Sequence, residues 1–443
     1  MFQIPECLDN KFRKGAEIIK DCNSVRIITH YDADGVSSAS LLYSAMKRSG
    51  KNFHISFLKD LTEDNLKSLL KGSYDCIILA DLGSSFVSLL EEYGKVLILD
   101  HHPPERDSEK IVHINPIFCN ISGTSGACGS TLSYIFSMYI DEENWKNYPA
   151  FFTGVVGDRQ HLNGYSGLNK IIVDYLEGKG VKKYSDISLD GSNLKEMLLY
   201  ATDPFLPGYT GSEESVSELL GKLKIKEDIS IKDMDDDTKT YIYSWIAINL
   251  IKNNVEKDIV QGIITEKHYL ETYETWDITL SSYIDAVARM NMQGLALRYL
   301  SGDMDKKNEI LEAWMNYKNI LIKELYNGMK NKIEKENIQY FYVQENSLAG
   351  STAGILMSYV FARDKPTFAI HDSNGEMHVS GRGTRTLVEK GLNLGKAMRS
   401  CAEKVKGAGG GHDIAAGSTI PSQRIDEFIE CLNQVVGSQL NRN

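Results

Sequence analysis

The feature that most constrains this chain is the alternation of short, β-branched runs with helical patterns in its first half. The strand-like runs lie at 25–28, 53–57, 76–79 and 96–99. Strands that alternate with helices form parallel sheets whose faces the helices cover. The sequence therefore predicts an α/β domain built on a parallel sheet.

Metal-ligand residue types follow these predicted strands. The four clusters are His30, Asp32 and Asp34 after run 25–28, Asp81 after run 76–79, Asp100, His101 and His102 after run 96–99, and Asp158 after the apolar run 151–156, which we take as a further strand. In an open α/β sheet, ligands bind outside the carboxyl ends of the strands. We therefore expect the four clusters to converge, although they are far apart in the sequence.

A converging group of carboxylates and imidazoles is chemically suited to divalent cations. Crowded carboxylates repel one another, and two cations roughly 3.5–4 Å apart would neutralise them. This ligand set suits Mn²⁺ well and Mg²⁺ less well, and the absence of cysteine from every cluster argues against structural zinc. A single aspartate after a strand is commonly a turn or N-cap residue. Four such clusters together favour a metal site over caps and turns.

Composition limits the class of protein. The chain has 443 residues, a formal net charge of −11 and 42% hydrophobic residues, which is ordinary globular usage. Its longest apolar run, near 353–357, is far shorter than the roughly 18–20 residues that span a bilayer. We expect a cytoplasmic protein without a membrane partner. The seven cysteines form no Cys-x-x-Cys pair, and we predict that they are reduced and mostly buried.

The pattern changes along the chain in a way that predicts four segments. Residues 191–280 are mostly helix-like and acidic, and segment 305–335 has the spacing of a long linker helix. Strand-like runs return at 341–343, 367–370 and 377–379, followed by a helix at 394–405 and a glycine-rich stretch. We predict a catalytic domain at 1–190, a helical insertion at 191–280, a return to the first domain with the linker helix at 281–337, and a smaller α/β domain at 338–443.

The residues in these clusters resemble a known superfamily. Thr-His-Tyr-Asp-Ala-Asp-Gly at 29–35, Asp-Leu-Gly at 81–83, Asp-His-His-Pro-Pro at 100–104 and Gly-Asp-Arg at 157–159 resemble the four motifs of the DHH phosphoesterases. Ser-Gly-Arg-Gly at 380–383 and Gly-Gly-Gly-His-Asp at 409–413 resemble the DHH-associated C-terminal domain. Within the superfamily the chain is most similar to archaeal RecJ-like single-strand exonucleases, the GINS-associated group. One departure is Tyr-Ile-Asp-Ala-Val-Ala-Arg at 283–289, where the family usually has Leu-Asn-Ala-Cys-Gly-Arg.

The resemblance implies a role for each of these residues. One Mn²⁺ would be held by His30, Asp32 and Asp81, and the other by Asp34, Asp81, His101 and Asp158, with Asp81 bridging. His102 would contact the phosphate or the leaving oxygen. Asp100 would orient an imidazole, or it is a strand-end turn residue. The predicted substrate contacts are Arg159, Arg289, Ser380, Arg382, Gly409, Gly410, Gly411 and His412.

Physical reasoning supports the phosphate contacts of the C-terminal domain. Glycines let the backbone approach a phosphate closely, and arginine offers it a planar fork. The stretch 363–406 is also locally basic, which would help an acidic protein to hold a polyanion.

Together these features predict a two-metal phosphodiesterase that trims single-stranded DNA or RNA and releases mononucleotides, in DNA replication or repair. The expected cofactors are two Mn²⁺ ions, with Mg²⁺ as the alternative. The resemblance also implies that the insertion docks a GINS complex; a simple spacer is the other interpretation. Two alternative functions stay open, a nanoRNase or nucleotide phosphatase of the same superfamily and a replisome scaffold.

Overall fold

The computed structural model describes residues 2–59, 62–162 and 164–440. They form two compact units. The first contains the chain before Gly191 together with Ile264–Tyr317, and the second contains Gly191–Ile263 and the chain from Lys318 onward.

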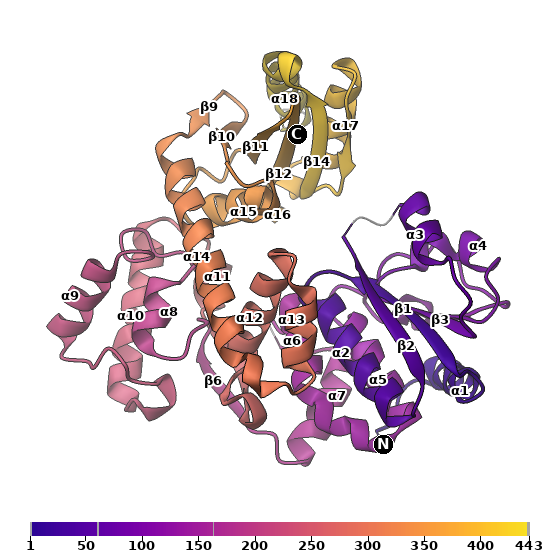
Figure 1. Cartoon of the computed structure of the whole chain (residues 1–443). Helices are drawn as coiled ribbons and strands as arrows, with labels where there is room; N and C mark the ends of the chain where they lie inside the picture. Colours follow the sequence, from indigo (N-terminus) through magenta and orange to yellow (C-terminus); the bar gives the residue numbers. More distant parts are fainter. Residues whose placement is uncertain (1, 60–61, 163, 441–443) are drawn as a thin grey trace. The chain divides into compact units, whose positions relative to one another are not determined.

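A five-stranded parallel sheet forms the centre of the first unit (Figure 1). Its strands, in spatial order, are β2 (Asn52–Leu58), β1 (Ser24–His30), β3 (Cys76–Ala80), β4 (Val96–Leu99) and β5 (Val112–Ile114). The side chains of β3, β4 and β5 are buried throughout, as expected for parallel strands with both faces covered. The predicted parallel α/β sheet is confirmed.

Helices cover both faces of this sheet. Ile28, Leu79 and Ile98 form one apolar cluster with the side chains of α3 (Glu63–Leu69) and α4 (Val87–Leu90). On the other face, Leu97 lies against Gly15 of α1 (Glu6–Lys20). The remaining helices of this part of the chain are α2 (Ala33–Arg48), α5 (Gly129–Ile140), α6 (Tyr148–Gly157) and α7 (Gly167–Gly178).

The apolar run 151–156 lies in helix α6, so the prediction that it is a strand is wrong. A short apolar run cannot be assigned by periodicity when it is buried on all sides, and every residue of α6 from Pro149 to Val156 is buried. Three of the four polar clusters therefore follow strands, and Asp158 follows a helix.

A small antiparallel sheet completes the first unit with two helices. It contains β6 (Lys183–Ile187), β7 (Ile264–Leu270) and β8 (Thr275–Trp276), and α12 (Asp277–Arg289) and α13 (Gln293–Leu300) follow. Ile187 at the end of β6 pairs with Ile264 at the start of β7. The chain therefore leaves the first unit and returns to it at directly paired residues of two neighbouring strands. Part of the segment that we predicted as helical insertion, 264–280, thus forms β7, β8 and the start of α12.

The insertion proper belongs to the second compact unit. Its helices are α8 (Leu194–Leu199), α9 (Glu213–Leu223), α10 (Asp236–Lys252) and α11 (Lys257–Gln261). The long helix α14 (Lys307–Lys330) has the position and length expected of the linker helix. Ile242, Ile246 and Leu250 form the buried side of α10, whereas Ile248 and Ile251 are exposed.

The C-terminal part of the second unit is a six-stranded mixed sheet. Its order is β13 (Ala408–Gly411), β14 (Ala415–Pro421), β12 (Glu376–Arg382), β11 (Thr367–Ser373), β10 (Gln339–Tyr342) and β9 (Ile333–Glu334). Only β10 and β11 pair in parallel. The accompanying helices are α15 (Ala349–Tyr359), α16 (Arg385–Glu389), α17 (Leu394–Lys404) and α18 (Ile425–Leu440). The predicted second α/β domain is confirmed.

Short 3₁₀ helices connect several of these elements. They lie at Ser84–Phe86, Pro116–Cys119, Glu142–Asn147, Ile231–Asp233, Glu271–Tyr273, Met304–Lys306, Asn346–Leu348 and Ser422–Arg424.

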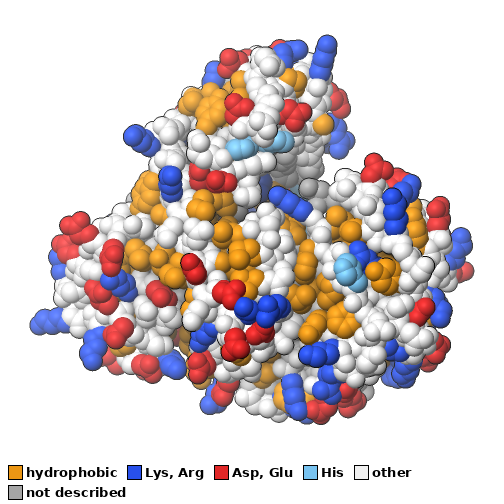
Figure 2. All heavy atoms as spheres, in the orientation of Figure 1, with side chains coloured by type: hydrophobic (Ala, Val, Ile, Leu, Met, Phe, Trp, Pro, Cys, Tyr) orange, Lys and Arg blue, Asp and Glu red, His pale blue; other side chains and the backbone are white. Residues whose placement is uncertain are grey.

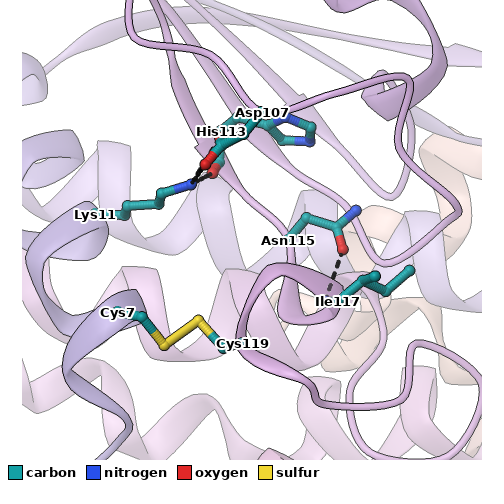
Figure 3. The surroundings of a disulfide bond; sticks show 7 residues. All are labelled: Cys7, Lys11, Asp107, His113, Asn115, Ile117 and Cys119. Atoms are coloured by element: carbon teal, nitrogen blue, oxygen red, sulfur yellow. Dashed lines mark hydrogen bonds and ion pairs between the residues drawn. A yellow bond between two sulfur atoms is a disulfide. The ribbon is translucent and has the colours of Figure 1, made fainter.

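Four of the cysteines are paired, which corrects the prediction that all are reduced. Cys7 on α1 is bonded to Cys119 (Figure 3), and Cys401 on α17 is bonded to Cys431 on α18. Cys22, Cys76 and Cys128 are free and buried, as predicted. The paired cysteines are 112 and 30 residues apart in the sequence, and helix packing brings them together, so their spacing carries no signal of the pairing.

Two surface properties bear on binding. In the described part of the chain, no helix is long and apolar enough to cross a membrane. Acidic and basic side chains are interspersed over the face shown in Figure 2, so the net charge of −11 is not concentrated in one patch there.

Candidate metal centre

The carboxyl ends of three adjacent strands bring the predicted ligands together in the first unit. His30 ends β1, Asp81 follows β3, and His101 follows β4. In the strand order 2-1-3-4-5, the connections from β1 and β3 run in opposite directions, and ligands bind at this switch point. Asp81 has a left-handed backbone with φ of 59°, which is uncommon for a residue with a side chain.

A first group of ligand atoms lies around His30. Its Nδ1 is 2.9 Å from Oδ2 of Asp32 and 3.6 Å from Oδ2 of Asp81. Asp32 also caps α2, because its carboxylate accepts a hydrogen bond from the backbone N–H of Gly35 at 3.1 Å. The same residue thus serves both as an N-cap and as a member of the cluster.

A second group lies around His101. Its Nε2 is 3.2 Å from Oδ1 of Asp81, 3.3 Å from Oδ2 of Asp158 and 4.0 Å from Oδ2 of Asp34. Asp81 therefore presents one oxygen to each group. This is the arrangement that the predicted bridging role requires.

Asp34 sits in a tight cradle made by two other helices. Its oxygens accept hydrogen bonds from the backbone N–H groups of Gly129, at 2.6 Å, and Ser130, at 2.8 Å, in the first turn of α5. The N-terminus of a helix favours an anion. A Cβ atom on Gly154 of α6 would lie 2.4 Å from Oδ1 of Asp34, so only glycine fits there.

The hydrogen bonding of His101 fits a metal ligand. Its Nδ1 donates to the carbonyl oxygen of Gly123 at 2.5 Å, which leaves Nε2 as the nitrogen with a lone pair when the ring is neutral. Nε2 is buried and makes no hydrogen bond of good geometry with any described residue, yet it faces the carboxylates of Asp81 and Asp158. The lone pairs of Nε2 and of the two carboxylates thus face one another, and a cation between them would remove their repulsion.

The pKa values of these groups agree with a cation site. Burial, together with the charge of Asp81, raises the pKa of Asp34 to about 7. Burial, together with Asp34, also raises the pKa of Asp158. Burial lowers the pKa of His30, but the carboxylates of Asp32 and Asp81 outweigh it and raise the value to about 11. In the metal-free protein, bound protons therefore supply the compensation that cations could supply.

His102 and Asp100 lie beside this centre. The backbone N–H of Ser84 donates to Oδ2 of Asp100 at 2.8 Å, and Nδ1 of His102 lies 2.8 Å from Oδ1 of the same carboxylate. This hydrogen bond raises the pKa of His102. The ring is 54% exposed, so its other nitrogen can reach a substrate. Asp100 thus contacts both an imidazole and the backbone of the turn that follows β3.

A cavity of about 250 Å³ opens beside the centre. Its lining residues are His101, His102, Pro103, Gly123, Thr124, Asp158 and Gln160.

The sequence reasoning missed two residues at this centre. Gln160 donates to the carbonyl oxygens of Gly123 and Ala127, each at 3.0 Å, and so supports the acceptor that orients His101. Cys128, Asp34 and Asp158 form a group whose ligand atoms all lie within 4.8 Å of one another. The four sequence clusters contain no cysteine, as stated, but the fold brings Cys128 to Asp34 and Asp158 from a different part of the sequence.

Arg159 and Arg289, predicted to contact the substrate, belong to the same unit. Arg159 follows Asp158 with a left-handed backbone, φ 58°, and is exposed. Arg289 ends α12, and its Nε donates to Oδ2 of Asp285 at 2.6 Å. The charge of Asp285 raises the pKa of Arg289.

The remaining predicted contacts lie together in the second unit. Ser380 and Arg382 are on β12, and Gly409, Gly410 and Gly411 belong to the edge strand β13, which ends just before His412. Ser380 and Gly410 both pair with Gly417 of β14, so they lie in one row across the sheet. The Arg382 guanidinium lies so close to α15 that a Cβ on Gly350 would be 2.3 Å from Nη2.

Comparison with known families identifies this arrangement. Residues 24–154 match the model of the DHH family, N-terminal domain, and residues 335–438 match that of the DHHA1 domain. The chain is 30% identical over 441 residues to an uncharacterized protein of Methanocaldococcus jannaschii, a match that covers 96% of each. This chain belongs to the DHH family. A shorter match, 25% identical over 167 residues, is to a Bacillus subtilis prophage protein whose name describes a single-strand DNA-specific exonuclease; it covers 36% of this chain and 29% of that protein.

Solved structures share its fold. RecJ from Thermus thermophilus, in complex with Mn²⁺, superposes with a TM-score of 0.59 at 15% identity over 97% of this chain. This chain spans 55% of that protein's length. CDC45 from Entamoeba histolytica superposes with a TM-score of 0.64 at 11% identity over 98% of each chain. This DHH family member thus has a RecJ-like fold.

Proposed function

We propose that this DHH family member is a metal-dependent exonuclease that trims single-stranded DNA or RNA and releases mononucleotides. The observation that carries the proposal is the position of Asp81, whose buried carboxylate presents one oxygen to His30 and the other to His101. Two relatives, an Mn²⁺-bound RecJ and a protein named as a single-strand DNA-specific exonuclease, also support it.

The residues of the centre would hold two divalent cations, and Mn²⁺ is favoured over Mg²⁺. His30, Asp32 and Asp81 would hold one, and Asp34, Asp81, His101 and Asp158 the other. Such ions supply a nucleophilic water at neutral pH and neutralise charge on the phosphate. The imidazoles favour Mn²⁺ because Mg²⁺ prefers oxygen ligands.

The protein groups around the centre bind and orient the substrate. The hydrogen bond to Asp100 holds the His102 ring with its exposed edge turned to solvent, so that it can contact a phosphate oxygen or protonate a leaving oxygen. In the second unit, Ser380, Arg382 and the Gly409–Gly411 backbone with His412 would bind phosphate groups of the strand. Arg159 and Arg289 would add positive charge near the scissile phosphate.

Digestion of end-labelled oligonucleotides tests this proposal. DNA and RNA strands of 2, 5 and 20 nucleotides are incubated with Mn²⁺, Mg²⁺ or EDTA, using the wild type, Asp81→Ala and, as a matched control, the exposed Asp64→Ala. We expect mononucleotide release from all lengths by the wild type and the control, and none by Asp81→Ala. Cleavage of the shortest strands alone would favour a nanoRNase, and full activity of Asp81→Ala would refute the metal assignment.

A second candidate function is partner docking in a replisome, through the insertion. The CDC45-like fold favours it, and so does α10, which exposes Tyr241, Ile248 and Ile251 to 54%, 51% and 60%. The sequence motifs relate this chain to GINS-associated nucleases, so a GINS complex is the proposed partner. Co-purification with GINS, lost in an Ile248→Lys variant that keeps its hydrolytic activity, would support docking. Retained co-purification would refute the assignment of this side of α10 as the docking surface.

A further inference from the structure

One face of the C-terminal sheet carries the predicted phosphate contacts and is covered in part by α15, which packs against β11 and β12. Along β12 the residues alternate, with Met377, Val379 and Gly381 buried and His378 and Ser380 half-buried. Met377 and Val379 pack into the apolar core together with residues of α17 and α18. His378, Ser380 and Arg382 therefore share the opposite face at successive alternate positions.

A pair of histidines lies on this face. His378 on β12 is directly opposite His371 on β11. The ring centroids are 6.4 Å apart and the ring planes differ by 24°. Both residues are half-buried, so part of each side chain faces solvent.

Each ring is anchored by one nitrogen. Nδ1 of His371 donates to the carbonyl oxygen of Val343 at 3.3 Å, and Nδ1 of His378 lies 3.0 Å from the hydroxyl oxygen of Thr419. Val343 and Thr419 lie on opposite sides of the pair, since β10 neighbours β11 and β14 neighbours β12. The two rings are thus held in fixed orientations, which lowers the entropic cost of binding a flat group against them.

A flat, uncharged group suits this position better than a phosphate. Glu376 lies at the next alternate position of β12 and is exposed, so its carboxylate would repel a phosphate near the histidine pair. Unpaired nucleobases stack on aromatic side chains, histidine among them, on open sheet faces. Bases inside a duplex have no free face to offer.

We propose that His371 and His378 form a base-stacking subsite for single-stranded nucleic acid, on the sheet face that carries Ser380 and Arg382. This inference rests on the proposed function. The Cα atoms of His378 and Arg382 are about 14 Å apart along the strand. A stacked strand advances about 3.4 Å per nucleotide, so the subsite takes a base about four stacked nucleotides, or fewer extended ones, from the phosphate bound by Arg382.

The test is the length dependence of binding. Fluorescence anisotropy in EDTA measures the affinity of the full-length protein for single-stranded oligonucleotides of 2 and 8 nucleotides. The variants are His371→Ala, His378→Ala, His378→Phe, His378→Lys and, as a control, His54→Ala, an exposed sheet histidine of the first unit. We expect each alanine variant to weaken binding of the 8-mer by about 5- to 100-fold. Binding of the 2-mer should not change.

Each outcome separates the explanations. Wild-type affinity for the 8-mer in His378→Phe, with loss in His378→Ala, supports stacking. Rescue by His378→Lys and not by His378→Phe would replace stacking with a charge contact and overturn the proposal. Unchanged 8-mer binding in both alanine variants would also overturn it while leaving the nuclease function intact. If the wild type neither binds nor cleaves single strands, the proposed function itself fails.

Discussion

Replacing Asp34 by asparagine measures how much the crowded carboxylates lower the free energy of unfolding of the metal-free protein. Burial and the charge of Asp81 raise the pKa of Asp34 from 3.8 to about 7. A pKa difference of one corresponds to about 1.4 kcal/mol, so ionised Asp34 costs the folded state about 4 kcal/mol at pH 8. Because the folded-state pKa is the higher one, the protonated Asp34 side chain contributes to the free energy of unfolding. This contribution is fully present below about pH 4 and is lost as the pH rises from there through about 7.

The Asp34→Asn variant removes this cost of about 4 kcal/mol at pH 8, but its amide nitrogen cannot accept one of the two backbone N–H bonds that Asp34 accepts, which costs about 1–3 kcal/mol. In EDTA at pH 8 the variant should therefore be more stable than the wild type by about 1–3 kcal/mol. At pH 5 this advantage should fall by about 2–3 kcal/mol, because most of the folded wild type then carries a neutral Asp34. With saturating Mn²⁺ at pH 8 the wild type should recover, since a ligand that binds only the folded state stabilises it, whereas the variant should gain little.

Urea unfolding followed by circular dichroism gives these free energies, and calorimetry gives the Mn²⁺ stoichiometry. Asp64→Asn, an exposed aspartate in the first turn of α3, is the matched control and should change neither quantity appreciably. A stability difference between Asp34→Asn and the wild type that does not grow from pH 5 to pH 8 in EDTA would refute the argument that the carboxylates are crowded and need compensating charge.

Three further variants test individual contacts. Gly154→Ala should abolish Mn²⁺ binding at the second group, measured by calorimetry, because its Cβ would lie 2.4 Å from Oδ1 of Asp34; retained stoichiometry would contradict the cradle. Gln160→Leu should lower Mn²⁺ affinity roughly 10-fold or more, as expected for a group that orients a ligand, with unfolding monitored as the control. Arg382→Ala should raise KM for single strands, at a cost of about 1.5–3 kcal/mol for the lost charge-assisted bond, and leave Mn²⁺ binding unchanged.

The parallel sheet and most of its ligands could be predicted because the signals are local. Strands such as β3 and β4 are continuous apolar runs, and the polar residues that follow them stand at the sheet edge by geometry alone. The sequence pattern of α6 predicts a strand because burial on all sides removes the periodicity that separates the two kinds of element. Even so, Asp158 reaches the centre, because either element can end beside His101.

Residues that act through tertiary packing could not be predicted. Gln160 supports His101 through the carbonyl oxygen of Gly123, and Cys128 approaches Asp34 only because α5 packs against α2. No spacing in the sequence encodes such contacts. The same holds for the two disulfides, whose partners belong to separate helices.

The insertion is joined to the C-terminal domain through the second half of α14. Nζ of Lys318 donates to the hydroxyl oxygen of Thr202 at 2.9 Å, and the Tyr326 hydroxyl donates to the carbonyl oxygen of Thr210 at 2.7 Å. The insertion thus belongs to the same compact unit as β12 with its Arg382, whereas the predicted metal ligands all lie in the other unit. A partner bound to the exposed side of α10 would therefore act on the unit that carries the proposed strand contacts. We expect such a partner, when it is titrated into the nuclease assay and into Mn²⁺ calorimetry, to change KM for single-stranded substrate at a lower partner concentration than it needs to change the affinity for Mn²⁺. The opposite order would show that the partner acts on the metal-binding unit instead.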